Sequence, residues 1–147
     1  MQTQAQQTEH LDTSSLVKLY GLTFSHLSDL WDDMLPLLNK AADNNPDHDI
    51  TSFINAIREK EMQLWCVFDA DKPIAIMLTE IIETPKRKYV LLQECVGEGM
   101  KDWAEYIEII KEWARSIGCR SLKWEGRKGW VRVLKGKQTG IITEIEL

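Results

Sequence analysis

The sequence has no long hydrophobic run, few cysteines and few histidines. Its longest apolar stretch, Ile74–Leu78, is far too short to cross a bilayer. The first residues, MQTQAQQTEH, carry neither a basic nor an apolar segment, so we expect no secretory signal. Cys66, Cys95 and Cys119 have no CxxC spacing, which argues against a disulfide scaffold and for a reducing compartment. No histidine has metal-ligand spacing to a cysteine, so no metal site is predicted.

The composition that is present is typical of a globular protein. The 147 residues are 44% apolar and 28% charged and include six tryptophans, enough apolar material for one buried core. The first residues are rich in Gln, Thr and Ser. We therefore expect a polar N-terminal tail over residues 1–20 and a single domain over residues 21–147.

Charge is unevenly distributed along the chain. The formal net charge is −5, whereas residues 118–137 contain seven cations and one anion. This basic segment fits a solvated face, and it also fits a site for an anion such as a cofactor phosphate or a nucleic acid. No helix-turn-helix, zinc-finger or RNA-recognition signature accompanies it. Nucleic acid is therefore kept only as an alternative partner, bound through residues 118–137.

The first part of the chain shows helical periodicity. Apolar residues recur at helical spacing over residues 24–43, with Thr23 or Ser25 as the cap and Pro36 expected to kink or split the helix. The Asn-Asn-Pro-Asp sequence at 44–47 breaks this pattern, and a second helix over residues 50–57 is expected to start at Asp49 or Thr51.

Three strands are expected next, over Met62–Phe68, Pro73–Glu83 and Lys88–Val96. The turns between them are short, which allows only an antiparallel meander. Asp102–Ile117 has an apolar stripe at i, i+3, i+4 and i+7 spacing and is predicted to be a helix ending at Gly118. Because this helix intervenes, the strand predicted at 119–125 should run parallel to Lys88–Val96.

A short helix over Lys128–Lys135 and a final strand over Gly140–Leu147 complete the predicted order. The last strand offers four residues for burial: Ile141, Ile142, Ile145 and Leu147. We therefore expect an α/β (α+β) fold, in which a mixed, mostly antiparallel sheet is flanked by helices and contains a central parallel β-α-β crossover.

Two strand carboxylates and one cysteine are candidate catalytic residues. Glu80 or Glu94 could act as a general base, directly or through water, and the alternative is that both belong to the solvent-facing side of a strand. Cys95 could pair with a distant histidine as a nucleophile, although a cysteine in a strand is more often a small core residue.

Two segments resemble the GNAT acyltransferase superfamily. Residues 101–119, KDWAEYIEIIKEWARSIGC, are similar to its central helix, which often ends in a WA…GC pattern. Residues 126–134, GRKGWVRVL, resemble the short helix after the next strand, especially in small GNAT-like proteins of bacteriophages and prophages. With the predicted order of elements, the resemblance extends over about residues 20–147.

The resemblance implies acetyl-CoA as the cofactor. Its pantetheine arm would pair with strand backbone where the strand before the central helix diverges from the strand after it. Its pyrophosphate would meet the free N–H groups at the start of that helix. The corresponding positions are Cys95, Val96, Gly97, Gly99 and Lys101, with the two glycines and the lysine forming an anion-binding nest.

The sequence departs from the family pattern at the pyrophosphate turn. Aligning the helices places Glu98 where the family has Arg or Gln, and Lys101 and Trp103 where it has small residues. A carboxylate repels a pyrophosphate, and an indole crowds its approach. The tyrosine that many members use as a general acid falls near Leu134, which cannot transfer a proton.

Three functions follow from these observations. The first is a phage- or prophage-encoded GNAT-fold protein in which acyl transfer is lost or marginal, acting as an interaction or virion-associated component in the host cytoplasm or the virion. Its partner would be a phage or host protein or a second copy of itself. The second is an active acetyl-CoA-dependent N-acetyltransferase acting on a primary amine. The third is a small nucleic-acid- or host-factor-binding protein that uses residues 118–137.

Overall fold

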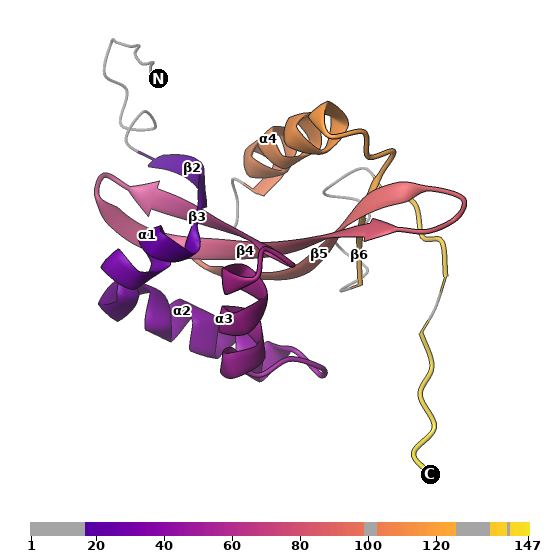
Figure 1. Ribbon diagram of the computed structural model, residues 1–147, viewed down its shortest axis with the longest axis horizontal. Helices are drawn as coiled ribbons and strands as arrows, with labels where there is room; N and C mark the ends of the chain where they lie inside the picture. Colours follow the sequence, from indigo (N-terminus) through magenta and orange to yellow (C-terminus); the bar gives the residue numbers. More distant parts are fainter. Residues whose placement is uncertain (1–16, 99–102, 126–135, 141) are drawn as a thin grey trace.

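The computed structural model describes residues 17–98, 103–125, 136–140 and 142–147. Helices precede a meander of strands, and a further helix leads to the last strand (Figure 1). In chain order the elements are β2 (Val17–Leu22), α1 (Phe24–Asp29), α2 (Trp31–Asn44), α3 (Ile50–Arg58), β3 (Gln63–Asp69), β4 (Lys72–Glu83), β5 (Lys88–Gly97), α4 (Trp103–Ser116) and β6 (Leu122–Trp124).

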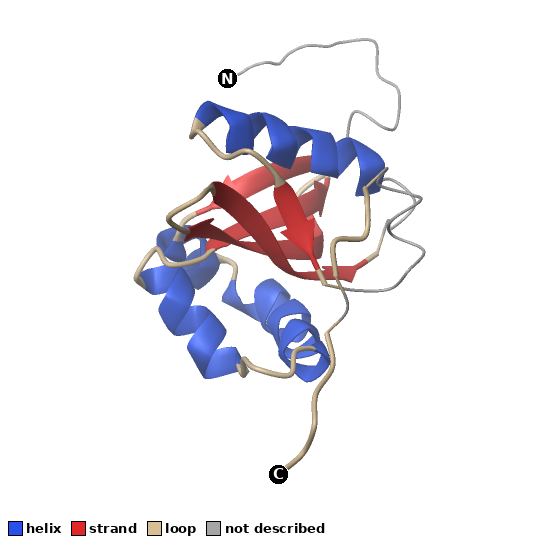
Figure 2. Ribbon diagram, turned by 90° about the vertical axis from the view of Figure 1, so that its right-hand side faces the viewer, coloured by secondary structure: helices blue, strands red, loops and turns tan. Residues whose placement is uncertain are grey.

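The strands form one sheet in the order β2-β3-β4-β5-β6. Neighbouring strands are antiparallel except β5 and β6, which run parallel. The predicted meander and the predicted parallel pairing of the strands on either side of α4 are therefore confirmed. Helices α1, α2 and α3 cover one face of the sheet and α4 covers the other (Figure 2). The predicted fold class is correct.

Strand alternation divides the apolar core between these two faces. On the face covered by α1, α2 and α3, Phe53 of α3 and Met34 of α2 are fully buried with Ile76 and Leu78 of β4. Asp49 starts α3 as one of the two predicted caps, because its carboxylate accepts the N–H of Ser52 over 2.8 Å. The cap fixes where α3 begins and therefore which side of it meets the sheet.

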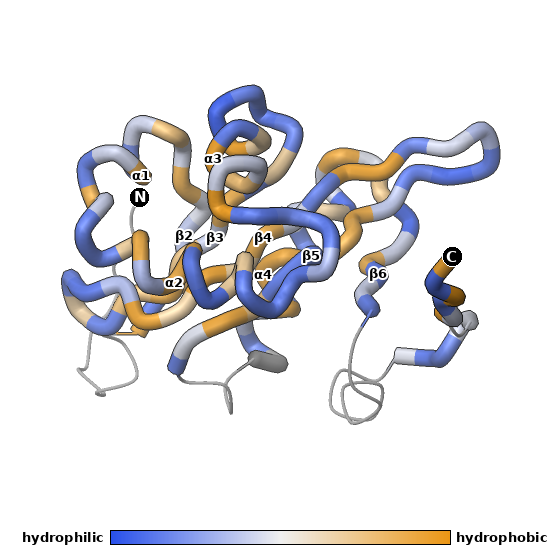
Figure 3. Tube along the Cα trace, turned by 90° about the horizontal axis from the view of Figure 1, so that it is seen from below, coloured by the Kyte–Doolittle hydropathy of each residue, from blue (hydrophilic) through white to orange (hydrophobic). Residues whose placement is uncertain are grey.

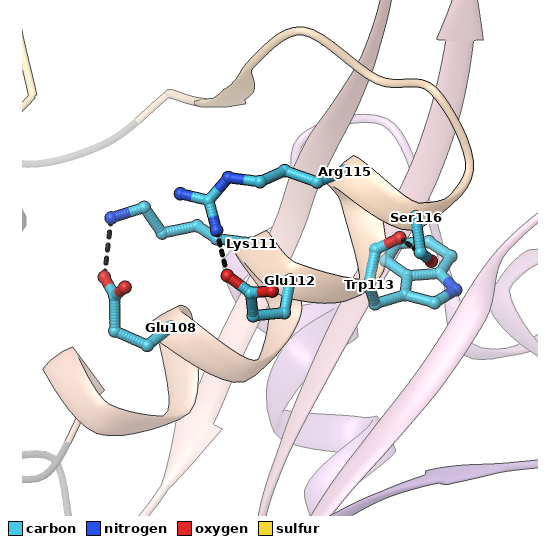
Figure 4. A network of polar contacts seen from close by, with 6 residues as sticks. All are labelled: Glu108, Lys111, Glu112, Trp113, Arg115 and Ser116. Carbon is cyan, nitrogen blue, oxygen red and sulfur yellow. Dashed lines mark hydrogen bonds and ion pairs between the residues drawn. The ribbon is translucent and has the colours of Figure 1, made fainter.

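Helix α4 has the amphipathic stripe that its sequence predicts. The residues that it buries are Tyr106, Ile107, Ile110 and Ala114. Its outer side carries ion pairs one turn apart, Lys111 with Glu108 and Arg115 with Glu112, while the ring of Trp113 points away from them (Figure 4). The apolar stripe therefore holds α4 on the sheet, and the ion pairs keep the opposite side in solvent.

The first helical region differs from its prediction. One helix over residues 24–43 was expected, kinked or split at Pro36, whereas the chain forms α1 and α2 with the break at Leu30. Thr23 caps α1, as predicted. Pro36 lies inside α2, where its ring removes one N–H donor without ending the helix. On either side of the break, α1 buries Leu27 and α2 buries Met34, Leu38 and Ala41 against the same core.

The N-terminal boundary also differs from its prediction. Residues 17–20 were assigned to the polar tail, but they belong to β2, which pairs with β3 from Val17 opposite Asp69 to Leu22 opposite Leu64. β2 is an edge strand that buries only Leu19, and the alternation of Val17 and Leu19 in VKLYGL is too short a pattern to predict a strand.

Two predictions concern the end of the chain. The strand expected over residues 140–147 is wrong for this structure, because Gly140 and residues 142–147 are exposed and unpaired. The short helix predicted over residues 128–135 lies outside the described residues. Within the described ranges, no helix is long and apolar enough to cross a membrane.

Candidate functional site

The candidate site lies where β5 continues beyond its parallel neighbour. β6 pairs only with Val90, Leu91 and Leu92, although β5 extends to Gly97. Along the described chain, the later residues of β5 therefore have no strand on their β6 side. Unpaired backbone donors and acceptors on such an edge can bind an extended, amide-containing ligand as an added strand would bind.

A β-bulge interrupts β5 at the start of this edge. Leu78 of β4 pairs with Glu94, whereas the next residue, Thr79, pairs with Leu92, which leaves Gln93 as the extra residue. A bulge changes which face the following side chains occupy. Because of it, Glu94 shares the face covered by α1, α2 and α3 with its partner Leu78, and Cys95 packs on the α4 side.

Glu94 is half-buried and joins β5 to the loop between α2 and α3. Its carboxylate accepts a hydrogen bond from Asn45 Nδ2 over 2.9 Å. The side-chain oxygen of Asn45 in turn accepts the backbone N–H groups of Asp47 and His48, over 2.9 Å and 2.8 Å. Burial raises the pKa of the Glu94 carboxyl above its ordinary value, and the hydrogen bond from Asn45 offsets part of that rise. A carboxylate of this kind is a stronger base than an exposed one.

Glu80 is the second predicted carboxylate, and it is also half-buried. It accepts a hydrogen bond from Nε2 of Gln93, the bulged residue, over 2.8 Å. Since Glu80 follows Leu78 by two positions on β4, it lies on the same face as Glu94. The structure therefore brings both predicted carboxylates to the face covered by α1, α2 and α3, and each holds an amide partner.

The same arrangement of strands and helices recurs in solved acetyltransferases. An aminoglycoside acetyltransferase from an uncultured soil metagenomic sample, in complex with sisomicin, matches with a TM-score of 0.69 and 9% identity, over 92% of this chain and 99% of that one. A predicted acetyltransferase from Clostridium acetobutylicum with acetyl-CoA matches with a TM-score of 0.63 and 11% identity, over 88% and 96%. AAC(6')-Iy with the bisubstrate analogue CoA-S-monomethyl-acetylneamine gives 0.67 and 13%, over 89% and 97%. The fold is GNAT-like.

The similarity to GNAT acetyltransferases is one of structure. No protein-family model matches the sequence, and no curated protein sequence matches it. At identities between 9% and 13%, the comparison shows the fold and leaves the chemistry of the site to its own residues.

Cys95 and Val96 have structural roles in the described chain. Val96 is 3% exposed and belongs to the core under α1, α2 and α3. Cys95 packs beside the α4 core, and burial, together with the charge of Glu94, raises the pKa of its thiol. A thiol held in its neutral form is a poor nucleophile, so the geometry disfavours the covalent role considered for Cys95. That the backbone groups of Cys95 and Val96 contact the pantetheine arm of a coenzyme stays a prediction.

Gly97 is required by the packing of β5 against β4. Its φ is +123°, and a Cβ built on it would lie 2.4 Å from the Cα of Ala75 and from the carbonyl oxygen of Ile74. The next residue, Glu98, has an exposed side chain, and its backbone N–H donates to the same Ile74 carbonyl over 2.9 Å. Gly99 and Lys101 lie outside the described residues, so the predicted anion-binding nest stays a prediction.

Sequence reasoning missed two residues at this site. Asn45 was interpreted only as part of a helix break, and nothing local indicates that it reaches Glu94, 49 positions away. Gln93 was unassigned because a bulge has no clear signature inside an apolar strand. Among the described residues, no group of three or more His, Cys, Asp or Glu could hold a metal ion.

Replacing Glu94 by glutamine tests the environment of this carboxylate through stability. Because its pKa is raised on folding, the folded protein holds the proton to higher pH than the unfolded chain, so the free energy of unfolding falls as pH rises through this window. Glu94→Gln removes that loss and should be more stable than the wild type at pH 7, with the difference shrinking below about pH 4. Denaturant melts between pH 3 and 8 measure it.

Asn45→Ala is the matched control for that comparison. It removes the hydrogen bond that lowers the pKa of Glu94, so the fall in stability with rising pH should become steeper than in the wild type. A wild type and a Glu94→Gln variant that differ by the same free energy at pH 4 and pH 7 would contradict the burial of this carboxylate.

Proposed function

We propose that this protein uses the GNAT fold as a binding scaffold, with acyl transfer lost or marginal. Its role would be that of an interaction or virion-associated component encoded by a phage or prophage. The proposal combines the fold with the residues found where coenzyme A would have to bind. One observation at the end of β5 carries it.

That observation is the bonding of Glu98. A GNAT coenzyme site needs backbone N–H groups directed at the pyrophosphate, starting at the turn after β5. Here the Glu98 N–H is already bonded to the carbonyl of Ile74, and the exposed carboxylate adds negative charge at the same turn. A phosphate that approaches this turn is therefore repelled by the Glu98 carboxylate, and the Glu98 N–H is not free to bind it.

Three further features support loss of catalysis. Gly97 is explained by its contact with Ala75, so the glycine does not require a bound phosphate. No tyrosine follows Tyr106 in the sequence, so the acid that many GNAT enzymes place after their last parallel strand has no counterpart of that type. Both candidate bases, Glu80 and Glu94, are engaged by amides of the protein itself.

The phage or prophage origin rests on the sequence resemblance of residues 126–134. In this proposal the protein resides in the host cytoplasm or the virion and binds a phage protein, a host protein or a second copy of itself. Nucleic acid stays an alternative partner through residues 118–137, of whose cations Arg120, Lys123 and Lys137 lie in the described part. The remaining cations near the centre of that segment lie outside it.

An acetyl-CoA-dependent N-acetyltransferase is the second candidate, and Glu94 favours it. A half-buried carboxylate with a raised pKa suits a general base that takes a proton from an ammonium group. The solved structures of similar fold include an aminoglycoside acetyltransferase, so a primary amine is the acceptor class that this candidate implies. Glu94→Gln would then lower the rate of acetyl transfer by about 100-fold or more.

Calorimetric titration with coenzyme A separates the two candidates. For the scaffold we expect no saturable heat up to about 1 mM ligand. Glu98→Gln should stay silent as well, because the substitution removes the charge but leaves the backbone N–H bonded to Ile74. The enzyme proposal would be correct, and the scaffold proposal wrong, if the wild type bound coenzyme A at micromolar concentration and acetylated an amine, and if Glu94→Gln abolished that acetylation.

A further inference from the structure

Cations from two distant stretches of the chain meet around Tyr89, near the start of β5. The guanidinium carbon of Arg87 lies 4.5 Å from the centre of the Tyr89 ring, and Nζ of Lys123 lies 5.0 Å from it. The backbone N–H of Val90 donates to the carbonyl of Ser121 over 3.0 Å, which holds the two stretches together. The folded chain therefore gathers a basic surface, defined here as Arg87, Tyr89, Ser121 and Lys123.

The members of the basic surface share one face of the sheet. Leu122 packs on the α4 side, so Ser121 and Lys123, its neighbours along the chain, lie on the opposite face. Arg87 is exposed and belongs to the turn between β4 and β5, which projects from the body of the molecule as a hydrophilic end (Figures 1 and 3). The basic surface is therefore part of a sheet face and not of a strand edge.

Within the described chain, the polar groups of this surface lack anionic partners. Arg87 and Lys123 form no ion pair with any described carboxylate. Glu80, the acidic residue of β4 on this face, is bonded to Gln93 instead. Ser121 Oγ is buried and has no hydrogen-bond partner, although buried hydroxyls normally have one. An oxyanion bound here would supply both an acceptor and the opposite charge.

The turn between β4 and β5 holds Arg87 in place before any ligand arrives. The N–H of Thr84 donates to the Arg87 carbonyl over 2.8 Å, and the N–H of Arg87 donates to Thr84 Oγ1 over 3.1 Å. A guanidinium that stacks on an aromatic ring keeps its N–H groups available for a bidentate bond to a carboxylate. Because the turn and Tyr89 already order this cation, less entropy is lost when it binds a ligand.

We propose that the basic surface binds an acidic segment of a partner protein. Arg87 and Lys123 would pair with carboxylates of that segment, and the Ser121 hydroxyl would donate to one of their oxygens. The inference rests on the proposed function for the choice of a protein as partner, and it adds the chemistry of that partner. It does not rest on the coenzyme turn, because β5 has 10 residues and its two ends lie about 30 Å apart.

An acidic protein segment fits this surface better than a nucleic acid does. A base that stacked on Tyr89 would compete with Arg87 and Lys123 for the ring, whereas binding of a single strand draws on such stacking. Binding of a duplex draws on about 6–10 phosphate contacts. The surface offers two cations, with Lys86 exposed at the same turn, and the whole chain has a net charge of −5 that repels a long polyanion.

An acidic peptide is the probe for this proposal. A fluorescein-labelled oligoglutamate peptide, titrated with the full chain and followed by fluorescence anisotropy at low salt, should bind with a Kd of about 100 μM or lower. Raising the salt concentration should weaken the binding, because salt screens exposed charges. An oligothymidylate of equal length, titrated in the same way, should bind more weakly than the peptide.

Paired charge removals locate the binding site. Arg87→Gln with Lys123→Gln should weaken peptide binding at least about tenfold, because it removes both cations of the surface. Arg87→Gln alone should weaken it about threefold, and this variant keeps the turn, whose hydrogen bonds to residue 87 use backbone atoms. Lys40→Gln with Lys72→Gln is the matched control, because it removes the same charge at exposed positions on α2 and at the start of β4. It should change the Kd less than about twofold.

The proposal is wrong if the peptide shows no saturable binding, if Arg87→Gln leaves the Kd unchanged, if the control pair weakens binding as much as the surface pair, or if the oligothymidylate binds more tightly than the peptide. The titration with coenzyme A judges the proposed function separately. If that titration is silent, failure of the peptide rejects this surface and leaves the scaffold in place. Micromolar binding of coenzyme A would reject the scaffold whatever the peptide does.

Discussion

Replacing Gly97 by alanine should lower the free energy of unfolding by about 3–5 kcal/mol. The added Cβ would lie 2.4 Å from the Cα of Ala75 and 2.6 Å from its Cβ, far inside contact distance. Ala75 belongs to β4, which is paired on both sides and cannot move away without disturbing the sheet. The φ of +123° adds backbone strain, because residues with a side chain rarely adopt this backbone conformation. Denaturant unfolding measures the loss.

Two other glycines separate the causes of that loss. Gly118→Ala has a positive φ of +84° but no atom within 4 Å of its Cβ, so it should cost only about 1–2 kcal/mol. Gly21→Ala has an ordinary contact with Trp65 at 3.7 Å and should change stability by less than about 0.5 kcal/mol. Equal losses at Gly97 and Gly118 would mean that β5 relaxes away from β4, and that the packing argument for Gly97 fails.

Replacing Trp113 by alanine should lower the free energy of unfolding by about 3 kcal/mol. The Trp113 ring packs edge-on against Trp65, with centroids 5.1 Å apart, and contacts both apolar clusters on the α4 side. Truncation leaves a void between α4 and the sheet, which the neighbouring side chains fill only in part.

Glu112 provides the control one position away on the same helix. Its side chain is 75% exposed and pairs with Arg115 in solvent (Figure 4), so Glu112→Ala should cost less than about 0.5 kcal/mol. Paired thermal or denaturant melts of the two variants make the comparison. Similar costs for Trp113→Ala and Glu112→Ala would show that the assigned face of α4 is wrong.

The features predicted correctly from the sequence depend on residues close together in the chain. The stripe of α4 is visible because buried and charged positions alternate with helical spacing over Tyr106–Ile117. The parallel pairing of β5 and β6 follows from the helix between them, since a short turn cannot make that connection. Local periodicity and connection length were enough for the fold class.

The features that escaped prediction are set by distant parts of the chain. β2 is stabilised by its pairing with β3, from Leu22 opposite Leu64, rather than by its own composition. The break at Leu30 divides the buried residues between two helices, with Leu27 on α1 and Met34 and Leu38 on α2. The hydrogen bond of Asn45 to Glu94 joins a loop to a strand 49 positions later. Such contacts follow only from the assembled tertiary structure.

The role of Glu80 and Glu94 in a site stays a prediction. The sequence drew attention to them because polar residues inside apolar strands are conspicuous. Their surroundings were not predicted, since the bulge at Gln93 decides that Glu94 faces α2 and α3 rather than α4. Gly97 was assigned to an anion-binding nest from its position, and the structure adds a packing reason for the same residue.

The central claim is that the turn after β5 does not bind coenzyme A, and it is tested most directly at the backbone amide of Glu98. In a titration with coenzyme A followed by ¹H–¹⁵N NMR, we expect the Gly97 and Glu98 amide signals to stay in place up to about 1 mM ligand. The Glu98 amide should also exchange slowly with solvent deuterium, as a donor to the Ile74 carbonyl would. Saturable shifts of both amides at micromolar ligand would contradict the scaffold and show a pyrophosphate bound at the end of β5.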